Sequence, residues 1–162
     1  MKYYKITNKE ENHNGLQYHD GLIEDIKPFN PSGSCKSGGI YFASKDILVF
    51  LDYGPWIREV TLPDGEEVYE NPGSPKKYKS HKVILGKRKE IDLDVIKDLV
   101  KEGADIHAND NEALRWAAEN GHLDVVKYLV SMGADIHALD DGTLRWAAIN
   151  GHKDVVKYLK SI

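Results

Sequence analysis

Few residues of this 162-residue sequence fall in patterns that could perform chemistry. The sequence contains no phosphate-binding glycine loop, no dinucleotide fingerprint, no HExxH zinc motif and no GxSxG nucleophile motif. The single cysteine, Cys35, excludes an internal disulfide, and without a convincing basic partner its thiol is expected to be inert. His107 and His137 occupy the same position in two repeated segments, but two imidazoles without a third ligand are too few for a zinc site. We therefore expect no catalytic residue, no metal and no cofactor.

The residues best suited to bind a partner are those that differ between two nearly identical segments. Residues 103–132 and 133–162 align without a gap and are identical at 22 of 30 positions. The candidate positions are Asn109, Asn111, Glu112 and Glu119 in the first segment, and Leu139, Asp141, Gly142 and Ile149 in the second; Asp110 and Asp140, which are identical but lie among them, are included.

Two arginines, Arg115 and Arg145, occupy the same place in the two segments. They could form a basic ladder that contacts a partner. They could instead pair with the nearby Asp110 and Asp140 and only stiffen the structure. The sequence supports both interpretations equally.

Helical periodicity explains how these candidates would be positioned. A tandem period of this size is typical of stacked helical units. A short first helix is expected to end at Asn120-Gly121, where a left-handed cap forms easily. A second helix from Leu123 would carry an apolar stripe. We expect Trp116 and Trp146 to pack in the core, and His122 and His152 to make helix-capping hydrogen bonds.

The segments LRWAAENGHLDVVKYLVSMGADIHA and LRWAAINGHKDVVKYLKSI resemble the ankyrin-repeat family, in the form found in amoeba-infecting giant viruses of the Mimivirus type. Residues 93–100 align with 123–130, so a half repeat at 91–102 is expected before the full units 103–132 and 133–162. The resemblance implies binding through projecting fingers and a concave helix face. The period is 30 residues and not the family's usual 33 or so, so we expect short β-hairpin fingers.

Residues 1–88 predict a small α+β domain with a mainly antiparallel sheet. Strands are expected at 3–6, 39–42, 56–62 and 82–85, with one main helix from Ser44 to about Tyr53. The expected fold class is therefore this α+β domain followed by an all-α ankyrin solenoid over 89–162. Because an open solenoid end needs a cap, we infer that residues 1–88 cap the array. The lysine-rich segment 76–79 is expected to be a solvated loop.

The N-terminal sequence also resembles two known families. Its segments NHNGLQYHDGL, CKSGGIYFAS, FLDYG and REVTLP are similar to a domain that precedes repeat arrays in large viruses and phages. The motifs YHDG, GIYFAS and EVTL follow the same order as those of ADP-ribosyltransferases. That resemblance implies NAD binding, with His19 at the ribose, Tyr41 at the nicotinamide ring and Glu66, Glu67 or Glu70 as the final glutamate. The simpler interpretation, which we favour, is a turn at YHDG and a buried strand at GIYF.

Charge and composition narrow the class of function. The net charge is −4, and residues 91–162 hold 8 basic against 13 acidic residues, so a nucleic-acid partner is disfavoured. No apolar run is long enough to cross a membrane, and the first residues lack the features of a secretory signal. We expect an intracellular adaptor for protein partners, with host-cell proteins as the candidate partners and the host cytoplasm as its location if the chain is viral. The alternatives are an ADP-ribosyltransferase-like enzyme with an ankyrin targeting arm, and a purely structural capping domain.

Overall fold

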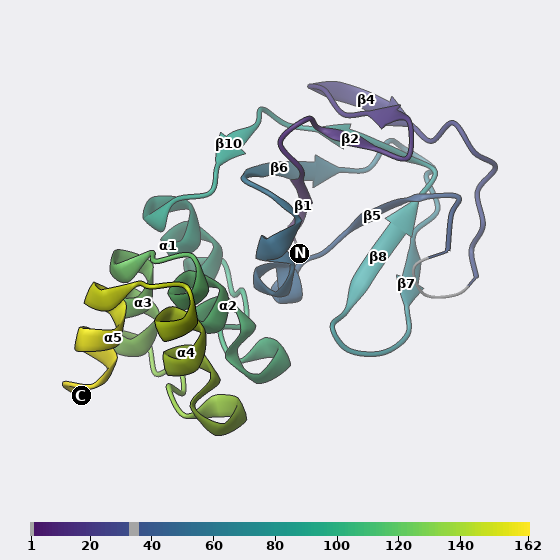
Figure 1. The fold of residues 1–162 in the computed structure, drawn as a ribbon. Helices are drawn as coiled ribbons and strands as arrows, with labels where there is room; N and C mark the ends of the chain where they lie inside the picture. The colour runs from purple at the N-terminus through teal and green to yellow at the C-terminus, as the bar shows by residue number, and fades with distance from the viewer. Residues whose placement is uncertain (1, 33–35) are drawn as a thin grey trace. The chain divides into compact units, whose positions relative to one another are not determined.

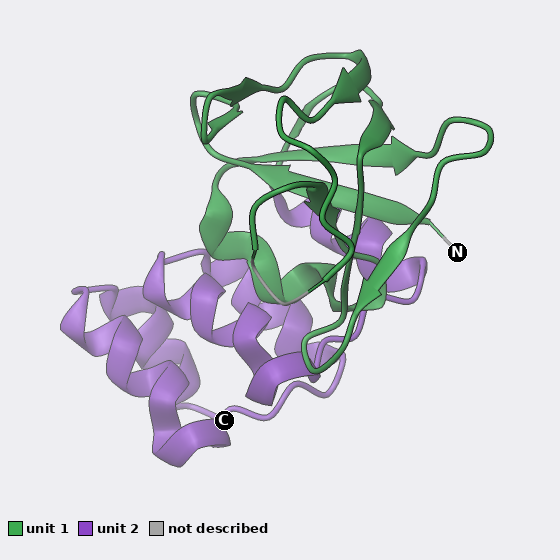
Figure 2. Ribbon diagram, turned by 90° about the vertical axis from the view of Figure 1, so that its right-hand side faces the viewer, with its two compact units in different colours: residues 1–91 green, residues 92–162 purple. Residues whose placement is uncertain are grey.

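The computed structural model describes residues 2–32 and 36–162, so the expectation for Cys35 lies outside the described residues. The chain divides into two compact units, residues 1–91 (unit 1) and residues 92–162 (unit 2), which Figure 2 colours separately. The elements of unit 1 are β1 (Tyr3–Thr7), β2 (Asn12–His13), β3 (Leu16–Gln17), β4 (Gly21–Glu24), β5 (Ile40–Phe42), η1 (Lys45–Tyr53), β6 (Trp56–Thr61), β7 (Tyr69–Asn71), β8 (Lys77–Ser80), β9 (Lys82–Leu85) and β10 (Lys89–Glu90).

Unit 1 is built from antiparallel sheets (Figure 1). The largest has the strand order β1-β6-β9-β4, and β10 also pairs with β6. A second sheet has the order β5-β8-β7, and β2 and β3 form a separate hairpin. Residues alternate between the two faces of a strand, so β9 buries Val83 and Leu85 while Ile84 stays exposed.

Aromatic and branched side chains from both larger sheets form the core of unit 1. Its buried members are Tyr18, Ile23, Ile40, Phe42, Val60, Tyr78, Val83 and Leu85. Tyr3 of β1 packs edge-on against Phe42 and Tyr78, with ring centroids 5.0 Å away in both cases. The core therefore joins residues that lie far apart in the sequence.

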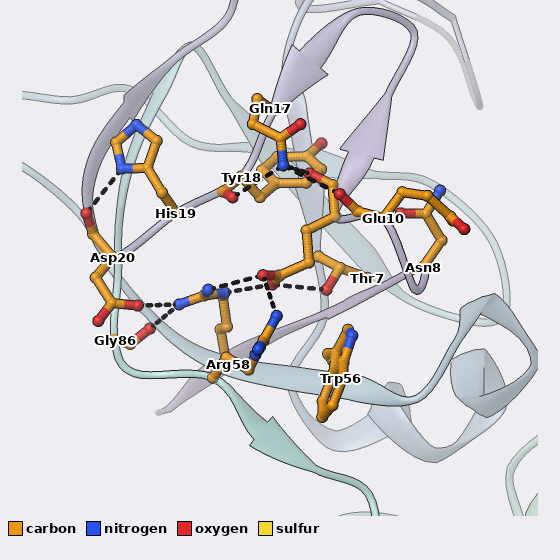
Figure 3. A network of polar contacts seen from close by, with 12 residues as sticks. Thr7, Asn8, Glu10, Gln17, Tyr18, His19, Asp20, Trp56, Arg58 and Gly86 are labelled. Atoms are coloured by element: carbon orange, nitrogen blue, oxygen red, sulfur yellow. Dashed lines mark hydrogen bonds and ion pairs between the residues drawn. The ribbon is translucent and has the colours of Figure 1, made fainter.

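A buried ion network holds the strand β6 to three loops, which contribute Glu11, Asp20 and Gly86 (Figure 3). The Arg58 guanidinium donates to both carboxylate oxygens of Glu11, at 2.8 and 3.1 Å, and to the Gly86 carbonyl at 2.7 Å. It also pairs with Asp20, while Arg88 and Thr7 donate to the Glu11 carboxylate. Since Glu11 and Arg58 are both buried, their bidentate pair replaces the water that each charge loses on folding.

Unit 2 consists of the helices α1 (Leu93–Lys101), α2 (Ala108–Glu119), α3 (Leu123–Ser131), α4 (Ala138–Ile149) and α5 (Lys153–Leu159). Asp92 caps α1, its carboxylate accepting the Val95 N–H at 2.9 Å. The predicted stripe of α3 is buried, with Val126 and Leu129 fully covered. The apolar side chains that recur at helical spacing in the sequence are therefore the ones that the helices bury.

The expected fold class, an α+β domain followed by an all-α solenoid, is wrong. The expected helix of residues 1–88 is the 3-10 helix η1, and no α-helix occurs among the described residues of unit 1. Ser44 makes no side-chain cap at the start of η1. In unit 2, α2 and α4 are interrupted by left-handed residues at 109–111 and 139–141, so the segment is not built from continuous helices.

Neutralising Glu11 is expected to lower the free energy of unfolding of unit 1 and to reduce the dependence of that free energy on pH. Hydrogen bonds from Arg58 hold the pKa of the Glu11 carboxyl below its usual value. Its stabilising contribution is therefore present above the unfolded pKa, near 4.5, and is lost as the pH falls toward the lower folded value. We expect Glu11→Gln to lose on the order of 3 kcal/mol at pH 7, because Arg58 keeps a buried charge without its main partner.

Urea unfolding at pH 7 and pH 3 measures both effects. The stability difference between wild type and Glu11→Gln should shrink at pH 3. Glu10→Gln, at an exposed neighbour, is the control and should behave as wild type. An unchanged difference at the two pH values would contradict this account.

Candidate binding surface of the ankyrin units

The predicted binding residues begin in an unusual backbone turn at the start of α2 and α4. Three consecutive residues at 109–111, and again at 139–141, have left-handed backbone angles, with φ between 52° and 59°. Such angles disfavour residues with a Cβ, and Asn and Asp tolerate them best, so Leu139 occupies a strained position. No β-hairpin forms in either segment, so the expectation of short hairpin fingers is wrong.

The two arginines hold these turns. Nη1 of Arg115 donates to the Asp110 carbonyl at 2.5 Å, and its other amino group pairs with the Glu112 carboxylate. Arg145 donates to the Leu139 carbonyl at 3.1 Å and has Gly142 where Arg115 has Glu112. Arg115 is buried and Arg145 is exposed. The partners are turn carbonyls and Glu112, so among the described residues neither arginine forms an ion pair with the carboxylate of Asp110 or Asp140.

Asn111 joins the two full units. Its Oδ1 accepts the backbone N–H of Asp135 from the next unit at 3.0 Å and lies 3.1 Å from Nδ1 of His107. The side chain is buried, and only an amide or carboxylate of this length can serve both neighbours. Asn111 is therefore a junction residue between the units, although the sequence suggested a contact for a partner.

A second junction involves His152, which was expected to cap its own helix. His152 makes no cap to α5; its Nε2 lies 2.8 Å from the Glu119 carbonyl of the preceding unit, an arrangement in which Nε2–H donates. A Cβ on Gly121 would lie 2.4 Å from the His152 ring, so glycine is required there. His122 also makes no cap, and its ring centroid lies 5.0 Å from that of Trp116. The capping expectation is wrong for both histidines.

The helix α4 packs against α2 of residues 103–132, but the equivalent face of α4 itself is exposed. Leu139, Trp146 and Ile149 are 52, 44 and 72% exposed, and all three belong to α4. Trp146 was expected in the core, and the sequence gave no sign of its exposure because LRWAA is identical in both units. Asp140, Asp141 and Arg145 are exposed on the same helix. In α2, by contrast, Asn109 and Asp110 are exposed while Glu112 and Glu119 are half-buried.

His137 and Asp141 form a solvent-exposed pair that corresponds to His107 and Asn111. Nδ1 of His137 lies 2.6 Å from the Asp141 carboxylate. That hydrogen bond raises the pKa of His137 above its ordinary value. Asp141 Oδ1 is therefore held by His137 as Asn111 Oδ1 is held by His107, and Asn111 Oδ1 also accepts the N–H of Asp135.

The residues of the enzyme alternative are not gathered at one site. Tyr41 lines a cavity of unit 1, whereas His19 does not line it and contacts the Asp20 carbonyl at 2.8 Å (Figure 3). Glu66 accepts the Lys82 N–H, and Glu70 pairs with Lys76. Within residues 2–32 and 36–162, no cluster of three potential metal ligands occurs. In the same residues, no helix has the length and apolar character needed to cross a membrane.

Comparison with known proteins agrees with this geometry. A family model for ankyrin repeats, in three copies, matches residues 86–161. The chain is 42% identical over 125 residues to "Uncharacterized protein R869" of Acanthamoeba polyphaga mimivirus, covering 74% of this chain and 91% of that protein. It is also 41 and 34% identical to the putative ankyrin repeat proteins R229 and R868 of the same virus, with 72 and 74% of this chain matched.

The chain belongs to the mimivirus type of ankyrin-repeat protein. It spans 40% of R229 and 61% of R868, less than two thirds of either. Unit 2 is less than half of the chain, so a match over 74% extends into unit 1. Ankyrin repeats indicate a protein–protein interaction module, and proteins of this family are generally not enzymes.

The junction role of Asn111 predicts unequal effects at two equivalent positions. Asn111→Ala and Asp141→Ala both replace a left-handed residue by alanine, so their backbone costs should be similar. Only Asn111 is buried and bonded to a following unit. We expect Asn111→Ala to lower the free energy of unfolding by on the order of 2 kcal/mol more than Asp141→Ala, measured by urea titration. Equal losses would show that the Asp135 contact contributes nothing.

Proposed function

We propose that the chain is an adaptor that binds a protein partner through the exposed face of α4. We define this face by Leu139, Asp140, Asp141, Arg145, Trp146 and Ile149. The observation that carries the proposal is a difference between two nearly identical units. The face of residues 103–132 is covered by α4, while the same face of residues 133–162 exposes three large apolar side chains. Exposed apolar patches of this kind mark interaction sites.

The covered junction indicates the chemistry of the expected partner. Toward α2, the last unit presents the Asp135 N–H, the His152 ring and the small residue Gly142, which lies against Arg115. These groups contact Asn111, the Glu119 carbonyl and Arg115. The equivalent positions in residues 133–162 are Asp141, the Ile149 carbonyl and Arg145. A partner with an ankyrin-like helical face, offering backbone and side-chain donors around a small residue, would complement them. The helices of such a partner would also cover Trp146 and Leu139.

The remaining candidate residues have different expected roles in this proposal. Asn109 and Asp110 are exposed at the edge of the preceding turn, where they could contact the same partner. Asn111 and Arg115 are buried and would act by positioning α4. A host-cell protein as the partner, the host cytoplasm as the location, and a capping role for residues 1–88 stay predictions.

A charge placed on this face should weaken binding strongly. Ile149→Glu exchanges the most exposed large apolar residue for a carboxylate, and a central interface residue commonly contributes about 2 kcal/mol, or roughly 30-fold in affinity. Ile26→Glu is the matched control, because Ile26 of unit 1 is 65% exposed.

The measurement has two stages. Proteins captured from host cells by wild type, Ile149→Glu and Ile26→Glu are compared, and each differential partner is then titrated against the three purified proteins. The proposal requires a partner that binds wild type and Ile26→Glu equally and Ile149→Glu at least tenfold more weakly. If every partner that binds directly is retained by Ile149→Glu, the face of α4 is not the binding surface.

A further inference from the structure

Unit 1 contains a cavity that the ankyrin function does not use. It has a volume of about 520 Å³, and its lining residues fall between Tyr4 and Lys77, all within unit 1. Small-molecule sites commonly measure about 300–1,000 Å³. The strands β1 and β5 and the helix η1 contribute to its walls. The cavity is therefore large enough for a small organic molecule.

The cavity has an excess of positive charge. Lys5, Lys27, Lys36 and Lys77 line it, and Asp25 is the only carboxylate in the described lining. The Asp25 carboxylate already accepts the backbone N–H groups of Lys27, at 3.0 Å, and Gly39, at 2.6 Å. Within the described residues, Asp25 forms no ion pair with Lys5, Lys27 or Lys36. An anion entering the cavity would thus meet several ammonium groups and one carboxylate that is already hydrogen-bonded.

Lys5 is the most unusual of these cations. Its residue is only 9% exposed, and no ion pair to its ammonium group is found within the described residues. Its Nζ donates to the Tyr41 carbonyl at 2.9 Å and lies 4.6 Å from the centre of the Tyr18 ring. Loss of hydration lowers the pKa of Lys5 to about 8. An ammonium has three donors, so the hydrogen bond to the Tyr41 carbonyl leaves capacity for a ligand.

The strand β8 carries a second concentration of positive charge, around the Tyr41 ring of β5. The ammonium groups of Lys77 and Lys79 lie 5.4 and 5.3 Å from the centre of the Tyr41 ring. Lys79 is fully buried, and its Nζ donates to the Ser32 carbonyl at 3.3 Å. Burial and the nearby Lys36 lower its pKa. A buried cation such as Lys79 is costly, and such groups concentrate at functional sites.

Another part of the cavity wall is apolar. Phe50 and Tyr53 of η1 line the cavity and contact each other, with ring centroids 6.0 Å apart. Leu16 adds an aliphatic side chain. A bare inorganic anion would leave this wall uncovered, so an apolar group on the ligand would add favourable burial.

We propose that this cavity binds a small organic anion, a phosphate or carboxylate group carried on an apolar body, with the Lys5 ammonium as its principal charge partner. Lys27, Lys36 and Lys77 would add electrostatic attraction. The aromatic residues of η1 would contact the apolar body. This site lies in unit 1 and is independent of the protein-binding face of α4.

Calorimetric titration of the full chain with matched probes tests the proposal. The probes are phenyl phosphate, benzoate and the neutral benzyl alcohol, all at one ionic strength. Wild type should bind at least one anionic probe at least tenfold more tightly than benzyl alcohol, and the preferred anion identifies the oxyanion class. Lys5→Met removes the charge at similar length and should weaken that binding at least tenfold. Lys9→Met, at an exposed lysine outside the cavity lining, should leave it unchanged.

A second measurement keeps the test decisive if Lys5→Met does not fold. Because a ligand that binds only the folded state stabilises it, the preferred anion should raise the Tm of wild type, and Lys27→Met should reduce that increase. The proposal is overturned if neither anion binds wild type more tightly than benzyl alcohol. It is equally overturned if a folded Lys5→Met binds as wild type does, or if the Tm does not rise.

Discussion

Coverage of one helical unit by the next decides which residues of unit 2 are buried. Leu114 and Ala118 of α2 are fully buried, whereas their counterparts Leu144 and Ala148 in α4 are half-buried and exposed. The segment LRWAA is identical in both helices, so its own sequence does not account for the difference, and we attribute it to the helices that pack against α2. Two polar contacts, from Asp135 to Asn111 and from His152 to Glu119, set the alignment of this neighbour. Stability of such arrays resides largely in these interfaces.

The sequence was sufficient to predict the ankyrin units because their periodicity is strong and repeated. The stripe of α3 and the turn at Gly121 follow from the spacing of apolar residues and glycine. Local sequence could not separate Trp116 from Trp146, because the residues around them are identical while their neighbours in space differ. It also missed the left-handed turns, which replace a hairpin in a shortened loop.

Unit 1 was less predictable, since long-range pairing decides its structure. Alternating apolar residues identified the strands β1, β6 and β9. The segment around Lys79 was expected to be a solvated loop because of its lysines, yet β8 lies between β5 and β7 and buries that side chain. The type of helix at η1 was also missed. Gly54 ends η1 with φ 149°, and a Cβ there would lie 2.4 Å from the Thr7 carbonyl, a contact that composition does not reveal.

The two polar contacts between the 30-residue repeats join Asp135 to Asn111 and His152 to the Glu119 carbonyl. Both repeats carry equivalent donors and acceptors at these positions. Insertion or loss of a whole 30-residue segment would therefore recreate each junction without any compensating change elsewhere. A gene encoding such a chain can lengthen or shorten by unequal recombination and still specify a folded product. The greater length of the mimivirus relatives R229 and R868 is compatible with this kind of growth. The exposed face of α4 then has a dual character, since the surface available to a partner is also the kind of surface on which another unit can pack.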